Sequence, residues 1–222
     1  MSGRFITIIL PLHILVTIWV LYSCDYVNHT GQNSSSFNTE SQKDTCDNPD
    51  ADINCSFIHM PSAINNIMNI AADKEPGDKM IIKGTIFKQD GKTPYQGVIL
   101  YAYQTDNNGY YSKSGKEKGA QKWHGRLHGW CKTDQNGKYE IRSIRPAPYP
   151  NNRIPAHIHM VIKEPLNNKT YYISDIVFKD DKMVNDLYLR SISSKQGGSG
   201  VVDLKKSNQG IWRGERNIVL KN

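Results

Sequence analysis

Short apolar runs, each ended by a tight turn, dominate the chain from residue 77 onward. The runs consist of β-branched and aromatic residues, and the turns between them are rich in Asp, Asn and Gly, the residues that turns favour. No helical spacing of apolar residues separates the runs, and strands spaced in this way favour packed sheets. The sequence therefore predicts an all-β protein, an antiparallel β-sandwich. The expected strands cover residues 80–87, 97–103, 138–144, 156–162, 171–178 and 217–220.

The composition agrees with this fold class. Among 222 residues there are 17 Gly, 10 Pro and 12 Tyr, a mixture that suits strands and turns better than a helical bundle. Hydrophobic residues make up 38% of the chain, enough for a core, so wholesale disorder is excluded. The formal charge of +7 is spread along the chain without a basic block, so we expect no nucleic-acid partner. A small anionic molecule fits the charge equally well.

The first 23 residues have the pattern of an export signal. Arg4 precedes an uncharged apolar run, residues 5–22, and the segment ends at Ser23-Cys24. Residues 21–24 resemble a bacterial lipobox, in which the signal is cut before a Cys that receives lipid. We therefore expect a membrane-anchored lipoprotein of the bacterial cell envelope, attached through Cys24 on the periplasmic or surface side. A retained transmembrane anchor and ordinary secretion remain open alternatives.

Residues 24–76 are expected to form a lipidated tether followed by a short helical or irregular edge segment, and residues 77–222 the domain. The first part is rich in polar residues, whereas apolar residues within 61–73 allow a short helix. Cys46 and Cys55, nine residues apart, could close a small loop in an exported protein. Cys131 lies in an alternating run and is expected to be a buried, inert thiol. Without a CxxC pair, we expect no structural zinc site.

The most informative motif is His157-Ile158-His159. Residues i and i+2 of a strand face the same side, so both imidazoles can reach one metal ion while Ile158 packs into the opposite layer. A proline-rich loop, residues 145–150, holds Tyr149 shortly upstream, and Tyr110 and Tyr111 follow a turn. A phenolate oxygen is a hard ligand that suits Fe(III). Taken singly, each of these tyrosines is equally compatible with an ordinary aromatic role.

Read together, these segments resemble the intradiol ring-cleavage dioxygenases, particularly the protocatechuate 3,4-dioxygenase type. The resemblance rests on NGYYS, GWCKTDQNGKYEIRSIRPAPYP and IPAHIH, and it spans about residues 77–222. It implies a β-sandwich with one non-haem Fe(III) per domain, held by Tyr111, Tyr149, His157 and His159, with Tyr110 as the alternative to Tyr111. It further implies cleavage of a catechol-type ring by O2 between its two hydroxyl-bearing carbons, which gives a muconate-type diacid. Tyr149 is then the phenolate that substrate displaces and that acts as internal base.

Two positions depart from the family pattern. Ile154 stands where the family often has Arg, and Arg153 lies one residue earlier. Asp175 stands where the family has Gln. Arg153 and Asp175 are therefore our further candidates for catalytic residues. Arg142, Arg145 and Arg153 flank the Tyr149 loop, which predicts a catechol that carries a carboxylate. Assembly into an oligomer stays open.

Two other interpretations compete with this one. The first is an exported carbohydrate- or protein-binding sandwich with a stacking platform of Trp123, Trp130 and Trp212. The second is a zinc or copper site made by the HxH pair together with His124 or His128.

Overall fold

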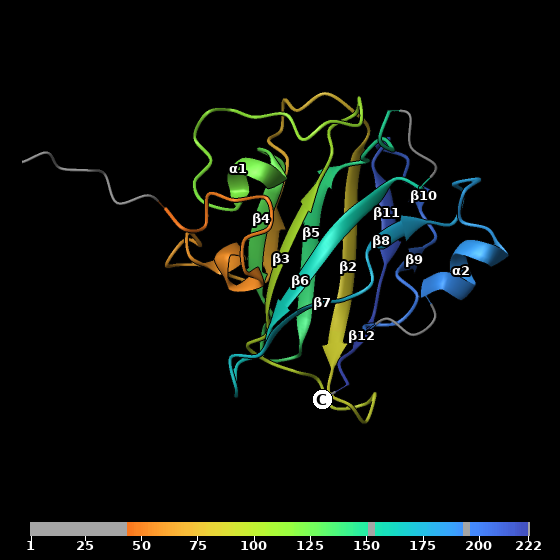
Figure 1. The fold of residues 1–222 in the computed structure, drawn as a ribbon. Coiled ribbons are helices and arrows are strands. Elements are labelled where there is room, and N and C mark those ends of the chain that lie inside the picture. Colours follow the sequence, from red (N-terminus) through yellow and green to blue (C-terminus); the bar gives the residue numbers. More distant parts are fainter. Residues whose placement is uncertain (1–43, 151–153, 193–195, 222) are drawn as a thin grey trace, which may run out of the picture. The chain divides into compact units, whose positions relative to one another are not determined.

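The computed structural model describes residues 44–150, 154–192 and 196–221, all of them within a unit that begins at Gln42. Its strands form two six-stranded sheets, seen in Figure 1, that bury a common core. The predicted all-β sandwich is thereby confirmed. Residues 1–23, Cys24 and Arg153 lie outside the described residues. Within the described ranges, no helix has the length and apolar character needed to cross a membrane.

The first sheet has the order β1-β5-β2-β11-β10, with β12 also paired to β2, and the second has the order β4-β3-β6-β8-β9, with β7 paired to β6. The long pairings are antiparallel, whereas β1 with β5, β2 with β11 and β12, and β8 with β9 are parallel. The elements are η1 (Ile53–Phe57), β1 (Ile67–Asn69), β2 (Lys79–Phe87), β3 (Ile99–Gln104), α1 (Gln121–His124), β4 (His128–Lys132), β5 (Lys138–Ile144), β6 (His157–Lys163), β7 (Thr170–Tyr172), β8 (Ile176–Phe178), α2 (Asp186–Ile192), β9 (Val201–Val202), β10 (Lys205–Lys206), β11 (Trp212–Glu215) and β12 (Ile218–Val219).

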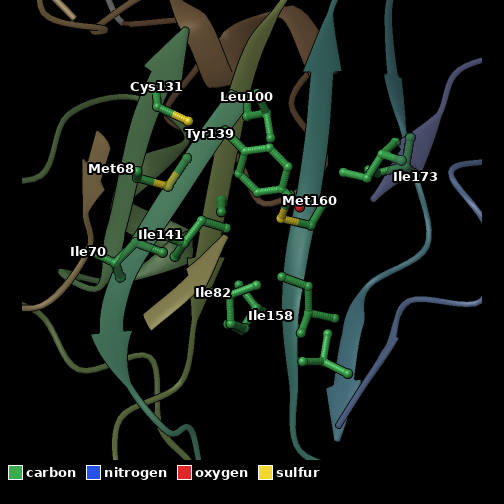
Figure 2. Close-up of a cluster of buried hydrophobic side chains, with 14 of the residues drawn as sticks. Met68, Ile70, Ile82, Leu100, Cys131, Tyr139, Ile141, Ile158, Met160 and Ile173 are labelled. Atoms are coloured by element: carbon green, nitrogen blue, oxygen red, sulfur yellow. The ribbon is translucent and has the colours of Figure 1, made fainter. Parts of the chain in front are cut away.

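The core lies between the sheets and consists of the inward residues of each alternating strand (Figure 2). Strand β6 contributes Ile158, Met160 and Ile162, all fully buried. Because successive side chains of a strand face opposite ways, this inward set leaves His157, His159 and Val161 on the outer face of the second sheet. Cys131 is fully buried as predicted, and burial raises the pKa of its thiol to about 12.

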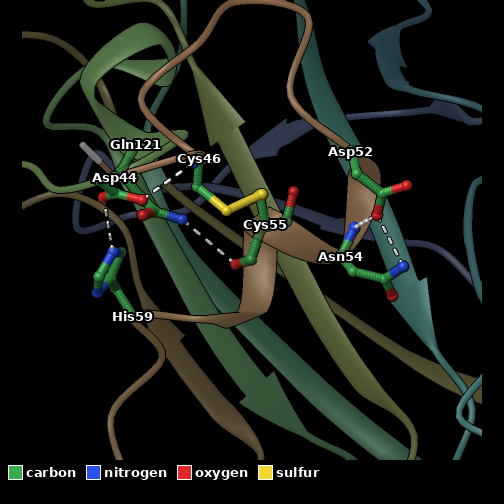
Figure 3. Close-up of a disulfide and its surroundings, with 8 residues drawn as sticks. Asp44, Cys46, Asp52, Asn54, Cys55, His59 and Gln121 are labelled. Atoms are coloured by element: carbon green, nitrogen blue, oxygen red, sulfur yellow. Dashed lines mark hydrogen bonds and ion pairs between the residues drawn. A yellow bond between two sulfur atoms is a disulfide. The ribbon is translucent and has the colours of Figure 1, made fainter. Parts of the chain in front are cut away.

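Residues 44–60 do not behave as the tether we expected, because they pack on the domain. Cys46 and Cys55 form a disulfide (Figure 3). The ring of Phe57 lies 6.3 Å from that of Tyr101, on the outer face of the second sheet. An apolar cluster between this segment and the sheet holds the segment on the domain. The few apolar residues of the segment show no regular spacing in the sequence, so the sequence did not predict this packing.

Residues 61–73, expected to form a short helical or irregular edge segment, do lie at a sheet edge, but they contain strand β1 at residues 67–69 and no helix. This strand pairs in parallel with β5 and places Met68 in the core. Met68 and Ile70, two residues apart, are both buried, so the segment also satisfies a strand period. The edge of β5 supplies hydrogen-bond partners that an isolated segment lacks. This tertiary pairing favours a strand over a helix at residues 67–69.

Candidate metal centre

Two imidazoles from β6 form the base of the candidate site. His157 and His159 project from the outer face of the second sheet, and their Nε2 atoms lie 3.1 Å apart. The intervening Ile158 is fully buried in the core, as the alternation predicts. The strand pairing with β3 and β8 fixes the backbone of both histidines.

Two loops bring phenol groups to these imidazoles. Tyr111 follows β3, and Tyr149 follows β5. The loops are joined, since the Ala147 amide donates to the Asp106 carbonyl and the Thr105 hydroxyl donates to the Ala147 carbonyl. At Gly109, whose φ is +86°, a Cβ atom would lie 2.2 Å from the Pro148 carbonyl oxygen. Only glycine allows this close approach, so it brings the two tyrosine loops into contact.

The side chain of Asp106 organises the Tyr111 loop. Its carboxylate accepts hydrogen bonds from the amides of Asn108 and Tyr110 and from the hydroxyl of Ser112. Tyr111 is thereby directed inward, whereas Tyr110 is 58% exposed. Sequence analysis predicted the turn here but did not identify Asp106, although an Asp that opens an Asp-Asn-Asn-Gly turn is a recognisable signal.

The four donor atoms converge. The hydroxyls of Tyr111 and Tyr149 lie 2.5 Å apart, and the Nε2 atom of His159 lies 3.0 Å from the first and 3.4 Å from the second. A transition metal binds imidazole nitrogen at about 2.0–2.1 Å, so ligand atoms around one ion lie roughly 3 Å or slightly more apart. The spacings of 3.0–3.4 Å around Nε2 of His159 therefore fit one metal ion, whereas the two phenol oxygens lie closer together, at the distance of a hydrogen-bonded pair.

Hydrogen bonds on the far side of each imidazole direct its lone pair into the site. The Nδ1 atom of His157 lies 2.8 Å from the Pro155 carbonyl oxygen, and that of His159 lies 3.2 Å from Oδ1 of Asp175. Both partners accept, so in the neutral rings Nδ1 carries the proton and Nε2 is an acceptor. Two acceptors 3.1 Å apart repel each other unless a cation lies between them. Asp175 therefore supports His159 from the Nδ1 side, and its carboxylate lies within 4.8 Å of a ring nitrogen of each histidine.

The phenols need a cation to ionise. Burial, followed by the hydrogen bond to Tyr149, raises the pKa of Tyr111 well above its usual range. Burial also raises the pKa of Tyr149. The same protein environment disfavours two phenolates, and a multiply charged metal ion would reverse this preference by direct pairing.

An aromatic stack that sequence analysis missed holds His159 from the side. Tyr103, the partner of His159 in the β3–β6 register, stacks on its ring at 4.5 Å and on the ring of His124 at 3.8 Å. The hydroxyl of Tyr101 donates to Nδ1 of His124 at 2.7 Å. Burial lowers the pKa of His124 to about 4, so the ring is neutral and can accept this bond. Period-two alternation places Tyr101 and Tyr103 on one face, but only the register brings them to His159.

This stack argues against the histidine alternative. Tyr103 separates His124 from His159, and Nδ1 of His128 donates to the carbonyl of Gly125 at 2.7 Å. The structure also argues against a stacking platform of tryptophans. Trp130 is on β4 of the second sheet and Trp212 is on β11 of the first, so the two do not share one sheet face.

A cavity of about 280 Å³ adjoins the donors. Tyr149, His157, His159 and Asp175 line it, together with Ile154 and with Tyr188 of α2. Tyr111 is not among its lining residues. Among the expected carboxylate-binding residues, Arg145 makes two hydrogen bonds to Asp180, and Arg142 bonds Glu140. Because both arginines pair with carboxylates of the protein, they do not support the prediction that the substrate carries a carboxylate.

The fold is a two-sheet β-sandwich, and a pair of tyrosines and an HxH pair converge on the outer face of its second sheet. The model of the family described as Dioxygenase matches residues 54–220, and the chain belongs to the intradiol dioxygenases. The match begins 23 residues before our expected domain boundary, in agreement with the packing of η1 and β1.

Similarity to individual proteins is distant. The chain is 27% identical over 107 residues to catechol 1,2-dioxygenase 2 of Acinetobacter lwoffii, a match that covers 41% of this chain and 37% of that relative. The 3-chlorocatechol 1,2-dioxygenase structure from Rhodococcus opacus 1CP has a TM-score of 0.53 at 22% identity, covering 72% of this chain and 68% of that one. The dioxygenase domain of a carbohydrate-binding fusion protein from Streptomyces sp. SirexAA-E has a TM-score of 0.54 at 17% identity, covering 73% and 92%. These structures share the fold.

Proposed function

We propose that this protein is an Fe(III)-dependent dioxygenase that cleaves a catechol-type ring between its two hydroxyl-bearing carbons and incorporates both atoms of O2. The observation that carries the proposal is the convergence of Tyr111, Tyr149, His157 and His159 with both imidazole lone pairs directed inward. Two hard phenolate oxygens favour Fe(III) over zinc or copper. When bound, Fe(III) supplies Lewis acidity toward the two oxygens of a catechol.

The residues around the candidate site have different roles in this proposal. Tyr149 lines the cavity and is half-buried, so it is the phenol that substrate meets first and the group suited to take a catechol proton. Tyr111 lies away from the cavity and remains a ligand. Asp175 keeps His159 in the tautomer that presents Nε2. Ile154, Tyr188 and Ile192 line the cavity and would give the ring apolar contacts.

Metal analysis and colour test the proposal. Protein purified without added metal is expected to contain about one iron per chain and to be red-brown, because tyrosinate-to-iron charge transfer absorbs visible light. Incubation with catechol under ¹⁸O2 is expected to give a muconate-type diacid with two labelled oxygens. A colourless protein that takes up zinc but not iron, or an iron protein that leaves a series of catechols intact, would contradict it.

We also propose that residues 1–23 are an export signal and that Cys24 carries lipid in the cell envelope. The Cys46–Cys55 disulfide supports export, since disulfides persist in oxidising compartments and are rare in the cytosol.

A further inference from the structure

A buried arginine joins the two sheets of the sandwich behind the candidate site. Arg216 directly follows β11 in the first sheet, and its amide donates to the Lys83 carbonyl of β2. Its side chain is 5% exposed, and its Nη2 atom donates to the Ser174 carbonyl at 2.6 Å. Ser174 lies between β7 and β8, which belong to the second sheet. The guanidinium therefore connects the first sheet to the segment that leads into β8.

Packing alone does not account for this arginine. Burial lowers the pKa of its guanidinium, and two of its nitrogens, Nε and Nη1, have no hydrogen-bond partner among the described residues. A buried charge with so few partners is destabilising, and an apolar side chain of similar size would fill the same space with a smaller penalty. The presence of Arg216 is therefore better explained by the contact that it makes than by stability.

That contact is made at a residue whose polar groups are all engaged. The Ser174 amide donates to the Gln196 carbonyl at 2.8 Å, and the Ser174 hydroxyl donates to the Gly198 carbonyl at 2.5 Å. The carbonyl of Ser174 accepts from Arg216. Three separate parts of the chain thus hold this one residue, and Arg216 is the part that comes from the opposite sheet.

The residue that follows Ser174 is Asp175, which contacts a candidate metal ligand. Oδ1 of Asp175 lies 3.2 Å from Nδ1 of His159. The backbone carbonyl of Asp175 lies directly against Gly200, whose φ is +71° and where a Cβ atom would overlap the oxygen. The carboxylate of Asp175 is among the groups that oppose the lowered pKa of Arg216, so the cation lies within electrostatic reach of it. A positive charge there stabilises the carboxylate as an acceptor.

We propose that Arg216 is a positioning residue for the metal site. Its guanidinium holds the Ser174 carbonyl and thereby fixes Asp175, which in turn fixes His159 in the tautomer that presents Nε2 to a metal ion. Arg216 is not among the residues that line the cavity, so it acts through Asp175 and not on the substrate. The inference rests on the metal site of the proposed function and assigns part of its support to the opposite sheet.

The tautomer of His159 in metal-free protein is the first readout. The full chain is treated with a chelator and studied at about pH 8, where imidazoles are neutral. The ¹⁵N chemical shifts of the ring distinguish the two neutral tautomers, and the His159 signals are assigned by their loss in His159→Gln. The Nδ1-protonated form is expected to dominate in the unaltered chain, because Nδ1 lies next to Asp175.

Substitutions of Arg216 are expected to change this tautomer in a graded way. Arg216→Met, which removes the guanidinium but keeps a long flexible side chain, is expected to raise the share of the Nε2-protonated form. Arg216→Lys, which retains a cation and a donor, is expected to restore most of the Nδ1-protonated form. Should Arg216→Met fail to fold, Arg216→Gln, which is neutral but keeps a donor, takes its place and is expected to shift the tautomer in the same direction.

Metal affinity is the second readout, and Tyr139→Phe is the matched control. The Tyr139 hydroxyl donates to the backbone carbonyl of Arg216 at 2.8 Å from within the core (Figure 2), so its loss disturbs the same residue but keeps the guanidinium. Arg216→Met is expected to weaken metal binding about tenfold. Tyr139→Phe is expected to lower the melting temperature and to leave the metal affinity unchanged.

The proposal is overturned if Arg216→Met leaves the His159 tautomer unchanged. It is also overturned if Arg216→Met and Tyr139→Phe weaken metal binding to the same extent, since the effect would then follow from stability alone. If the unaltered chain binds no metal, the proposed function fails, but the tautomer measurement still decides the role of Arg216.

Discussion

Tyr110 and Tyr111 are adjacent residues with opposite surroundings, and they provide a matched pair for testing the metal site. Tyr111→Phe removes a hydroxyl that lies 3.0 Å from Nε2 of His159, whereas Tyr110 is 58% exposed. Loss of a ligand is expected to weaken metal binding by at least 10- to 100-fold, since loss of an outer-sphere partner alone costs about that much. The measurement is bound metal after dialysis, together with the visible spectrum. Equal metal content in Tyr111→Phe and Tyr110→Phe would contradict the ligand assignment.

Stability below neutral pH is expected to depend on His124. Its pKa in the folded protein is about 4, against an ordinary value of 6.5, so between these values the unfolded chain binds a proton that the folded chain does not. Stability is therefore lost as pH falls from 6.5 toward 4. At pH 5 the loss is about 2 kcal/mol, and burial of His128, which lowers the pKa of that ring, acts in the same direction.

Denaturant titrations of His124→Phe at pH 7 and pH 5 measure this effect. Phe retains a ring against Tyr103 but cannot be protonated, so the difference in unfolding free energy between the two pH values should shrink. Tyr110→Phe, at an exposed position, is the control and should leave the difference as it is. If the two variants respond alike, His124 is not the group that titrates.

At this scale the sequence indicated the side chains that converge and named Asp175 as a candidate, but it did not reveal the contact of Asp175 with His159, nor Tyr103 or Asp106. The HxH alternation and the proline-stiffened Tyr149 loop are local features, so they could be read directly. Tyr103 and Asp175 reach His159 through strand register and loop closure, which depend on pairings between distant segments. For the same reason, Arg142 engages Glu140 and Arg145 engages Asp180, and neither lines the cavity.

Removal of the Cys46–Cys55 disulfide should lower the stability of the domain by a measurable amount. Closing the small loop between Cys46 and Cys55 is expected to contribute about 2–3 kcal/mol. For a domain of this size, that corresponds to a fall in melting temperature of about 5–10 °C in Cys46→Ser/Cys55→Ser. A reductant should lower the melting temperature of the unaltered protein and leave that of the double variant unchanged. Equal effects on both would mean that the disulfide does not stabilise the fold.

After residue 77 the strands that the sequence analysis expected were placed closely because alternation and turn residues agree there, but β4, the short strands β9, β10 and β11 and both helices were not among them. Residues 97–103 and 138–144 became β3 and β5 with shifts of at most two residues. Before residue 77 the prediction was wrong about local structure, since η1 and β1 owe their conformations to contacts with the sandwich. The run at 171–178 is divided into β7 and β8, a break that its apolar composition does not reveal.

For the whole molecule, the proposed lipid on Cys24 makes a direct prediction. Cys24→Ser is expected to move the protein from the membrane fraction to the soluble envelope fraction, or to leave the signal uncut, because acyl chains provide the attachment. Fractionation and the mass of the mature chain measure the outcome, with Cys131→Ala as a control for loss of a thiol. Unaltered fractionation and processing would remove the lipoprotein proposal.

Strand β6 has one face in the core and the other at the metal site, which links correct folding to metal competence. A register slip of one residue would turn Ile158, Met160 and Ile162 toward solvent and bury both imidazoles. Such a chain would lose stability and its candidate ligands together, so proteolysis of the unstable form would keep it from accumulating as an inactive protein. The amount of bound metal should thus report the fraction of correctly folded protein. Variants of β6 selected only for stability should also keep the two histidines on the outer face of the sheet.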